Sequence, residues 1–345
     1  MNKIRKIGLS ALAGSLVAVS ASAGDLSVTG TWEVTYKSDD KANVGNSFGS
    51  KSAMNFSGSG DVDGLGTATW FAAINDNNPA GYLSHKVTLD MGDMGEFGFD
   101  QGVGSYGANT IDDKSPTAWE ESWHNTANSS GGFSANGGSS GVLGYKNTFM
   151  DFNLNIEYAP EIGATDAGDG VAGARSTATT VTQTGSNTNF AITNSTLVDG
   201  LDFGAGYGSN DADSTVANSS SDIESIVGYA NYTMGSVTVG YTMSQSSGGT
   251  AASSANEVNA YGIAFNVNDN LSISYNEHNN EYKKTASSSA TGSGQADVEQ
   301  ESKGIAVAYT MGGATLAIQQ NEMDNVKGVS NTNDEITEIS LSLAF

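Results

Sequence analysis

Apolar and polar residues alternate along most of this chain with a period of two. Between residues 26 and 37, Leu26, Val28 and Trp32 fall on one face of an extended strand, while Thr29 and Glu33 fall on the other. Such a strand is apolar on one side only. Clear alternation recurs at 68–74, 83–89, 97–99, 152–158, 201–207, 237–243, 261–267, 271–275, 305–309, 316–318 and 339–345, and weaker alternation at 51–58, 141–147, 188–197 and 222–233. The pattern predicts an all-β fold of about sixteen strands.

The connections between these strands alternate in length. Short connections are predicted at 60–64, 92–95, 146–149, 198–200, 234–236, 267–270 and 310–313. Long connections, rich in Gly, Ser, Asn and Asp, are predicted at 38–50, 101–140, 159–187, 209–221, 245–256, 282–300 and 323–334. Tight turns at one end and long loops at the other are typical of an antiparallel up-and-down meander.

The polar face of the predicted strands carries small groups, such as Thr29, Asn153, Ser274 and Ser340. A soluble sandwich would need one of its two faces to form a dry core. A barrel of about sixteen strands is too wide for side chains to fill, so its polar face lines water and its apolar face contacts lipid. The sequence therefore predicts a transmembrane antiparallel β-barrel, closed so that no strand edge meets lipid.

The first 23 residues have the pattern of a secretory signal peptide. Lys3, Arg5 and Lys6 precede a short apolar stretch at 7–19, and Ala21 and Ala23 form an A-x-A cleavage site. Thirteen residues are too few for a helix to span a bilayer, which excludes the alternative of a membrane anchor. We expect the mature chain, 24–345, to form the barrel.

The chain of 345 residues is strongly acidic, with 14 Lys and Arg against 38 Asp and Glu. The net charge is -24, and it becomes -27 without the three basic residues of the leader, because 11 - 38 = -27. So acidic a chain is not expected to bind nucleic acid, which draws its affinity from basic residues. Its content of 37% apolar residues argues against disorder, and the absence of cysteine excludes disulfides and thiolate chemistry.

The layout resembles that of the general diffusion porins of the Gram-negative outer membrane. The resemblance is carried by the leader, by the meander, by the segment 141–146 that turns into 152–158, and by the alternating last strand. That strand resembles the signal read by the outer-membrane assembly machinery, and its apolar positions are Ile339, Leu341, Leu343 and Phe345. The resemblance implies a bacterial outer-membrane location, a homotrimer, and a water-filled channel in each chain for passive diffusion of small hydrophilic solutes and ions.

The resemblance also implies that the third long loop, at about 101–140, folds into the barrel and narrows it. This loop carries four carboxylates and two tryptophans, which are Asp112, Asp113, Glu120, Glu121, Trp119 and Trp123. We predict that the carboxylates and Trp119 form the constriction, and that tryptophans in so polar a loop pack against other groups. The alternative is a solvated acidic loop outside the barrel.

The wall facing this loop is predicted to lack the arginines that the family commonly carries. The end of the fifth strand reads Gly98-Phe99-Asp100-Gln101, and Arg175 is the only arginine after the leader. The charged wall positions are predicted to be Lys86, Asp100, Lys146, Asp151 and Glu157. Carboxylates in a narrow neck attract cations and repel anions, so we predict a cation-selective channel.

No catalytic or metal site is predicted. The three histidines, His85, His124 and His278, are scattered, and the adjacent Ser84 and His85 should point to opposite faces of a strand. No cofactor is expected, and the acidic loops are expected to bind Ca²⁺ or Mg²⁺ only loosely, where they could share it with lipopolysaccharide. Three other functions stay open: a plugged structural barrel, a surface adhesin and a substrate-specific channel.

Overall fold

The structure is a computed structural model that describes residues 26–39, 45–76, 84–124, 141–160, 184–212, 222–248, 256–282 and 298–345. The expected signal peptide and its cleavage site at Ala21 and Ala23 lie outside these residues. None of the helical segments among the described residues is both long enough and apolar enough to cross a membrane.

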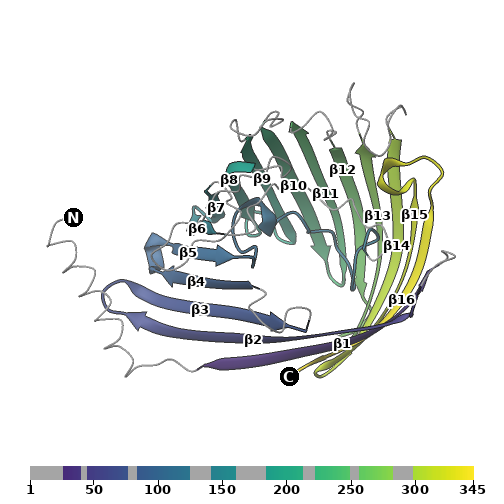
Figure 1. Ribbon diagram of the computed structural model, residues 1–345, viewed down its shortest axis with the longest axis horizontal. Coiled ribbons are helices and arrows are strands. Elements are labelled where there is room, and N and C mark those ends of the chain that lie inside the picture. The colour runs from purple at the N-terminus through teal and green to yellow at the C-terminus, as the bar shows by residue number, and fades with distance from the viewer. Residues whose placement is uncertain are drawn as a thin grey trace.

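Sixteen antiparallel strands close into a single barrel, in which each strand pairs with its neighbours in the sequence and β1 pairs with β16 (Figure 1). The strands are β1 (Ser27–Asp39), β2 (Phe48–Val62), β3 (Gly66–Asn75), β4 (Ser84–Asp90), β5 (Glu96–Gln101), β6 (Val142–Phe149), β7 (Phe152–Ala159), β8 (Thr184–Asn194), β9 (Leu201–Ala212), β10 (Ile223–Met234), β11 (Val237–Gly248), β12 (Asn256–Asn266), β13 (Leu271–Tyr282), β14 (Val298–Met311), β15 (Ala314–Asp324) and β16 (Asp334–Ala344). The described residues also include three short 3₁₀ turns, η2 (Gly92–Met94), η3 (Gly107–Thr110) and η4 (Val326–Gly328). The predicted count and topology are confirmed.

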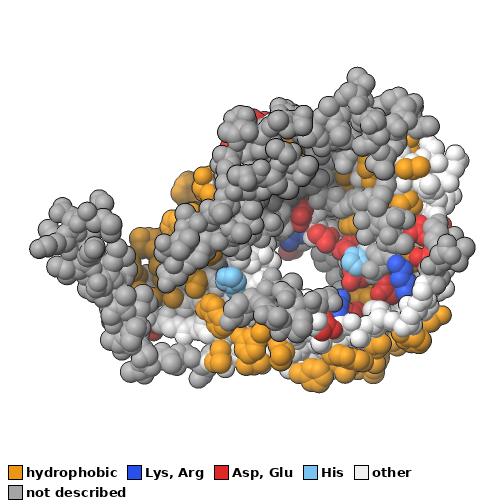
Figure 2. Space-filling model, in the orientation of Figure 1, with side chains coloured by type: hydrophobic (Ala, Val, Ile, Leu, Met, Phe, Trp, Pro, Cys, Tyr) orange, Lys and Arg blue, Asp and Glu red, His pale blue; other side chains and the backbone are white. Residues whose placement is uncertain are grey.

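The outer surface is apolar and the inner surface is polar. On β12 and β13, Tyr261, Ile263 and Ile273 face outward and are exposed, whereas Ser274 and Asn276 face inward and are buried. Figure 2 shows hydrophobic side chains along the visible outer rim and charged side chains around the central opening. The alternation that predicts the strands is thus the alternation between these two surfaces.

Several strands extend beyond the alternating stretches, at the ends that lead into long loops. Strand β14 begins at Val298, although apolar alternation starts only at Ile305, and β13 continues to Tyr282 past Tyr275. Both faces are polar in these extensions, since Glu277 and Glu301 occupy outward positions. Hydrophobic periodicity cannot reveal a strand that is polar on both sides, which explains why the strands predicted from the sequence are shorter than those in the structure.

One predicted wall position is wrong. Strand β6 runs through the predicted turn at 146–149, and the turn itself consists of Met150 and Asp151, with φ angles of 49° and 66°. Such left-handed pairs suit a two-residue hairpin, and aspartate tolerates this conformation. Asp151 is exposed in this turn and does not lie on the wall of the lumen.

The last residue closes the barrel at the turn end. The amide of Phe345 donates to the carbonyl of Gly30 at 2.8 Å, and the amide of Gly30 donates back to the carbonyl of Phe345 at 3.1 Å. Ile339 and Leu341 face outward on β16, and the Phe345 side chain is 77% exposed. The predicted assembly signal is therefore accessible from outside the barrel, although its role stays a prediction.

Candidate functional site: the third loop in the lumen

The third loop connects β5 to β6, and the structure describes it from Gly102 to His124 and at Gly141. Asp100, at the end of β5, fixes its first turn because its carboxylate accepts the amides of Val103 at 2.7 Å and Ser105 at 2.8 Å. Lys86 on β4 donates to the Ser105 hydroxyl at 2.9 Å. These bonds direct the chain from the strand end into the barrel.

Tyr106 then packs flat against the inner wall. Its ring covers two glycines, Gly98 on β5 and Gly144 on β6, where any Cβ atom would collide with it. The phenol donates to Glu96 at 2.9 Å, and the Lys146 ammonium lies 4.8 Å from the ring centroid. Tyr106 is completely buried.

The backbone of η3 is held by two inward-facing amides. Gly107 donates to the side-chain oxygen of Asn155 on β7 at 2.9 Å, and Ala108 donates to that of Asn189 on β8 at 2.6 Å. Asn189 in turn donates to Glu157 at 2.9 Å. Beyond these bonds, loop and wall share a small apolar cluster, which comprises Ala108, Ile111, Ala191, Val227 and Tyr229.

The second half of the described loop crosses the strands from β10 to β15. Asn231, Asn276 and Asn321 donate to loop carbonyls, and Ser274 accepts the amide of Ala118 at 2.8 Å. Trp123 stacks on His278 of β13, with ring centroids 4.5 Å apart. From Gly102 to His124 the loop therefore lies inside the barrel, and Trp123 packs against its wall. The return of the loop at 125–140 lies outside the described residues.

The predicted carboxylates lie on this stretch of loop. Asp113 is exposed to the lumen, whereas Asp112, Glu120 and Glu121 are half-buried. Burial, and then the charge of Asp113, raises the pKa of Asp112 to about 6 and that of Glu121 to about 8. Asp112, Glu120 and Glu121 are thus partly dehydrated, and Asp112 and Glu121 also lie close to the charge of Asp113. Such a group of acids favours a counter-cation over an anion.

A His and two carboxylates meet at the end of the described loop. His124 Nδ1 lies 3.4 Å from a carboxylate oxygen of Glu120. The candidate ligand atoms of Glu120, Glu121 and His124 all lie within 4.8 Å of one another. The spacing of the three histidines does not predict this trio, because the other two members are carboxylates of the same loop.

The wall formed by β1, β2 and β16 carries an ion pair near the end of the described loop. Lys51 on β2 lies 2.7 Å from Glu33 on β1, and Ser340 on β16 donates to Glu33 at 2.5 Å. Glu120 interacts electrostatically with Lys51 and with Glu338 on β16. The loop therefore faces a wall whose described part contains no arginine, because Arg175 lies outside the described residues.

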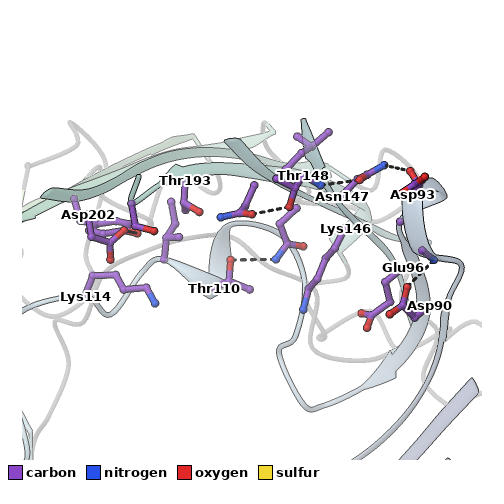
Figure 3. Close-up of a pocket in the computed structure, with 18 residues that line it drawn as sticks. Asp90, Asp93, Glu96, Thr110, Lys114, Lys146, Asn147, Thr148, Thr193 and Asp202 are labelled. Atoms are coloured by element: carbon purple, nitrogen blue, oxygen red, sulfur yellow. Dashed lines mark hydrogen bonds between the residues drawn. The ribbon is translucent and has the colours of Figure 1, made fainter. Parts of the chain in front are cut away.

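A cavity of about 920 Å³ lies beside the loop (Figure 3). Lys114 and Asp202 lie on one side of it, and Lys146, Glu96 and Asp90 on the other. Its lining is mixed in charge and includes Asp93 of η2 and Asn147 of β6, near the short-turn end of the barrel.

The remaining wall positions differ from their predicted role. Asp100 and Glu157 do face inward, but they are only 2% and 1% exposed because the third loop covers them. Lys86 and Lys146 also face inward and contact loop residues Ser105 and Tyr106. Asp100 and Glu157 therefore help to hold the loop and contribute little to the water-facing surface, whereas Lys86 and Lys146 are half-buried and Lys146 also lines the cavity. Sequence reasoning missed the amides Asn155, Asn189, Asn231, Asn276 and Asn321, which share this task.

Ser84 and His85 lie on opposite faces of β4, as predicted. Ser84 is buried on the lumen side, whereas His85 faces outward opposite Gln101. The two side chains therefore cannot act as a nucleophile and its base.

Comparison with known proteins finds likeness at the level of structure. No protein-family model matches the chain, and no curated protein matches its sequence. A porin structure refined at 1.8 Å superposes with a TM-score of 0.62 at 15% identity, covering 93% of this chain and 100% of that one. The OmpF protein of Salmonella typhi, in complex with daunomycin, gives 0.66 at 12%, covering 93% and 98%. The trimer form of OmpT, an outer-membrane protein of Vibrio cholerae, gives 0.60 at 12%, covering 94% and 100%. The chain therefore has the fold of the sixteen-stranded porins.

Proposed function

We propose that this protein is an outer-membrane channel for passive diffusion of small hydrophilic solutes and ions, and that it prefers cations. The observation that carries the proposal is a closed barrel, apolar outside and polar inside, with an acidic loop held across its lumen. A wide barrel with a polar interior suits a hydrated path. No catalytic step and no resident cofactor are part of the proposal.

Single-channel recording on the purified protein in planar bilayers tests the channel itself. We expect stable ohmic steps, and in a salt gradient a reversal potential of the sign set by cation permeation. Silence would favour a plugged barrel or an adhesin, and anion preference would contradict the proposed selectivity. Saturable block of the current by one solute class would instead indicate a substrate-specific channel.

We propose a homotrimer because part of the outer wall is poorly suited to lipid. Outward positions of β2 carry Ser50, Ser52 and Gly58 among the apolar Phe48, Met54 and Phe56, and β4 carries His85 beside the apolar Val87 and Leu89. The corresponding positions of β12 carry Tyr261, Ile263 and Phe265. Polar outward groups within a membrane call for a protein partner, so a second copy of the chain is expected to cover β2 to β4.

Ser52→Trp tests the proposed interface. The bulky ring would prevent close approach of two copies, so we expect the trimer band on unheated gels to give way to monomer. Ile263→Trp is the matched control on the proposed lipid face and should leave the trimer intact. A Ser52→Trp protein that stays fully trimeric would place the interface elsewhere on the wall.

We also propose that divalent cations bind outside the barrel, where the strands project beyond the apolar band. Glu257 on β12 lies directly opposite Glu281 on β13, which lies directly opposite Glu299 on β14. Carboxylate oxygens in such a row are the kind of ligand that Ca²⁺ and Mg²⁺ prefer. Ca²⁺ or Mg²⁺ could bridge this row to phosphates of lipopolysaccharide.

Chelation tests this proposal. We expect EDTA to lower the melting temperature of the purified trimer by several degrees, because a ligand that binds only the folded state stabilises it by mass action. Returning Mg²⁺ should restore the melting temperature. The Glu257→Gln/Glu281→Gln variant should melt at the same temperature with and without chelator, and an equal EDTA effect in the variant and the native protein would contradict the assignment.

The signal peptide and the assembly machinery complete the proposal. An exported chain needs a cleaved leader, for which Ala21 and Ala23 are the proposed cleavage positions. Recognition by the machinery is proposed for the outward residues of the last strand, which end in the exposed Phe345.

A further inference from the structure

Six inward-facing residues form one continuous row across the six strands from β10 to β15. Each residue lies directly opposite the next in the register of the sheet, and the row is Asn231, Gly240, Gly262, Asn276, Gly304, Asn321. The row divides by hairpin into three cross-strand Asn–Gly pairs. The hairpin β10–β11 carries Asn231 with Gly240, β12–β13 carries Asn276 with Gly262, and β14–β15 carries Asn321 with Gly304.

In each pair the amide leans across the neighbouring glycine. A Cβ atom on Gly240 would collide with the side-chain oxygen of Asn231, and one on Gly304 would collide with that of Asn321. On Gly262 a Cβ atom would lie 3.0 Å from the side-chain nitrogen of Asn276. None of these glycines has a positive φ, so the backbone conformation does not require glycine and the space does.

The amides donate to backbone carbonyls of the third loop. Asn231 donates to Lys114 at 2.7 Å, and Asn276 donates to Pro116 at 2.7 Å. Asn321 donates to both Glu121 at 3.0 Å and His124 at 3.1 Å. The loop is irregular here, so these carbonyls have no strand or helix to satisfy them and depend on the wall.

The glycines let the same loop lie close to the wall. A Cβ atom on Gly240 or Gly262 would come within 2.5 Å or 2.8 Å of Pro116 Cδ. One on Gly304 would come within 2.9 Å of Ser122 Cα. Real Cβ atoms do not approach other atoms so closely, so a larger residue at any of the three positions must displace the loop toward the lumen.

We infer that the three Asn–Gly pairs are positioning residues of the channel, which hold Lys114–His124 against the wall and thereby set the free width of the pore. This inference rests on the proposed channel function. The pairs do not touch the solute. They place Asp113, Glu120 and Glu121 at a fixed depth in the lumen through neutral hydrogen bonds and close packing, so the placement does not depend on the charge of those carboxylates.

Conductance of a glycine variant tests the inference in the assembled trimer. Gly262→Val should lower the single-channel conductance by about half or more, because Pro116 and its neighbours move into the pore. Gly228→Val is the matched control, since this strand glycine of β10 faces outward and the nearest atom to its Cβ would be the Gly204 carbonyl oxygen at 3.5 Å. Normal conductance of a well-folded Gly262→Val trimer would overturn the inference.

A second measurement reports the loop position without any current. The chain has no cysteine, so Ser115→Cys introduces a unique thiol on the loop, at a position that is only 8% exposed. We expect a water-soluble maleimide to label it at least tenfold faster when Asn231, Asn276 and Asn321 are replaced by Ala. A thiol at Ser59, an exposed position on β2, should label at one rate in both backgrounds. Equal labelling of the Ser115 thiol would refute the inference, whereas a silent native protein would count against the channel function alone.

Discussion

Replacing Asp112, Asp113, Glu120 and Glu121 by their amides should abolish most of the cation preference of the channel. The four side chains lie between residues 112 and 121 of the loop that crosses the lumen, and they face a wall whose described residues contain lysines but no arginine. At about 8 Å in water, one carboxylate attracts a monovalent cation by roughly 0.5 kcal/mol and repels an anion by the same amount. Each ionised carboxylate therefore changes the ratio of cation to anion permeability about fivefold.

Reversal potentials in a gradient of dilute salt provide the measurement, because screening weakens these interactions at high ionic strength. The matched control replaces Asp61, at the end of β2, and Asp63, in the short turn that follows, by Asn. These acids lie at the mouth of the barrel and not on the loop, so selectivity should change little. Unchanged selectivity in the four-residue variant would show that this loop does not form the selective constriction.

The acids also differ from one another in expected effect. Asp113 is exposed to the lumen, whereas burial and the charge of Asp113 favour the protonated form of Glu121. We therefore expect Asp113→Asn to account for more of the loss at neutral pH than Glu121→Gln.

The barrel was predictable because its signal is local. Each strand between 26 and 345 that touches lipid shows the alternation within its own seven or so residues, and hairpin turns fix how neighbours pair. The errors in predicted strand ends and turns have a local cause as well. The extension of β13 to Tyr282 is polar on both faces, and the predicted turn lies a few residues before Asp151 because Lys146, Asn147 and Thr148 interrupt the apolar alternation of β6.

The hydrogen bonds and contacts that fix the third loop to the wall could not be predicted from the alternation of apolar and polar residues. Asn155, Asn276 and Asn321 satisfy the rule that lumen positions are polar, and nothing in that rule says whether such a group meets water or a loop. Asp100 and Glu157 were assigned to the water-facing wall for the same reason. Whether such a side chain meets water or a loop depends on the path of a connection of about forty residues between β5 and β6. Strand register does not set that path where the structure describes it.

A signal for the Asn–Gly pairs was nevertheless present in the sequence. Once the turn at Gly235 and Ser236 is recognised, the hairpin register places Asn231 opposite Gly240. Neither lipid nor water contact requires a glycine on the polar face of a strand. Glycine inside a strand marks a close approach by another backbone. The recurrence of such a pair on three hairpins would have identified the wall that receives the loop.

The cation preference should also rise with pH. The raised pKa values, about 6 for Asp112 and about 8 for Glu121, lie within the range in which channels are recorded. Each carboxyl is neutral below its pKa and negative above it. Between pH 5 and pH 9 the loop therefore gains two negative charges, the first from Asp112 and the second from Glu121, so the cation-to-anion ratio should increase in two steps.

Single substitutions separate the two steps. Glu121→Gln should abolish the rise between pH 7 and pH 9 and leave the rise between pH 5 and pH 7, whereas Asp112→Asn should do the reverse. Asp113→Asn should move both steps to lower pH, because the charge of Asp113 contributes to both raised pKa values. A native channel whose selectivity is constant from pH 7 to pH 9 would contradict the role of Glu121. Since acids outside the lumen with ordinary pKa values are already ionised at pH 6, a step near pH 8 would identify a carboxyl that the folded loop itself has partly dehydrated.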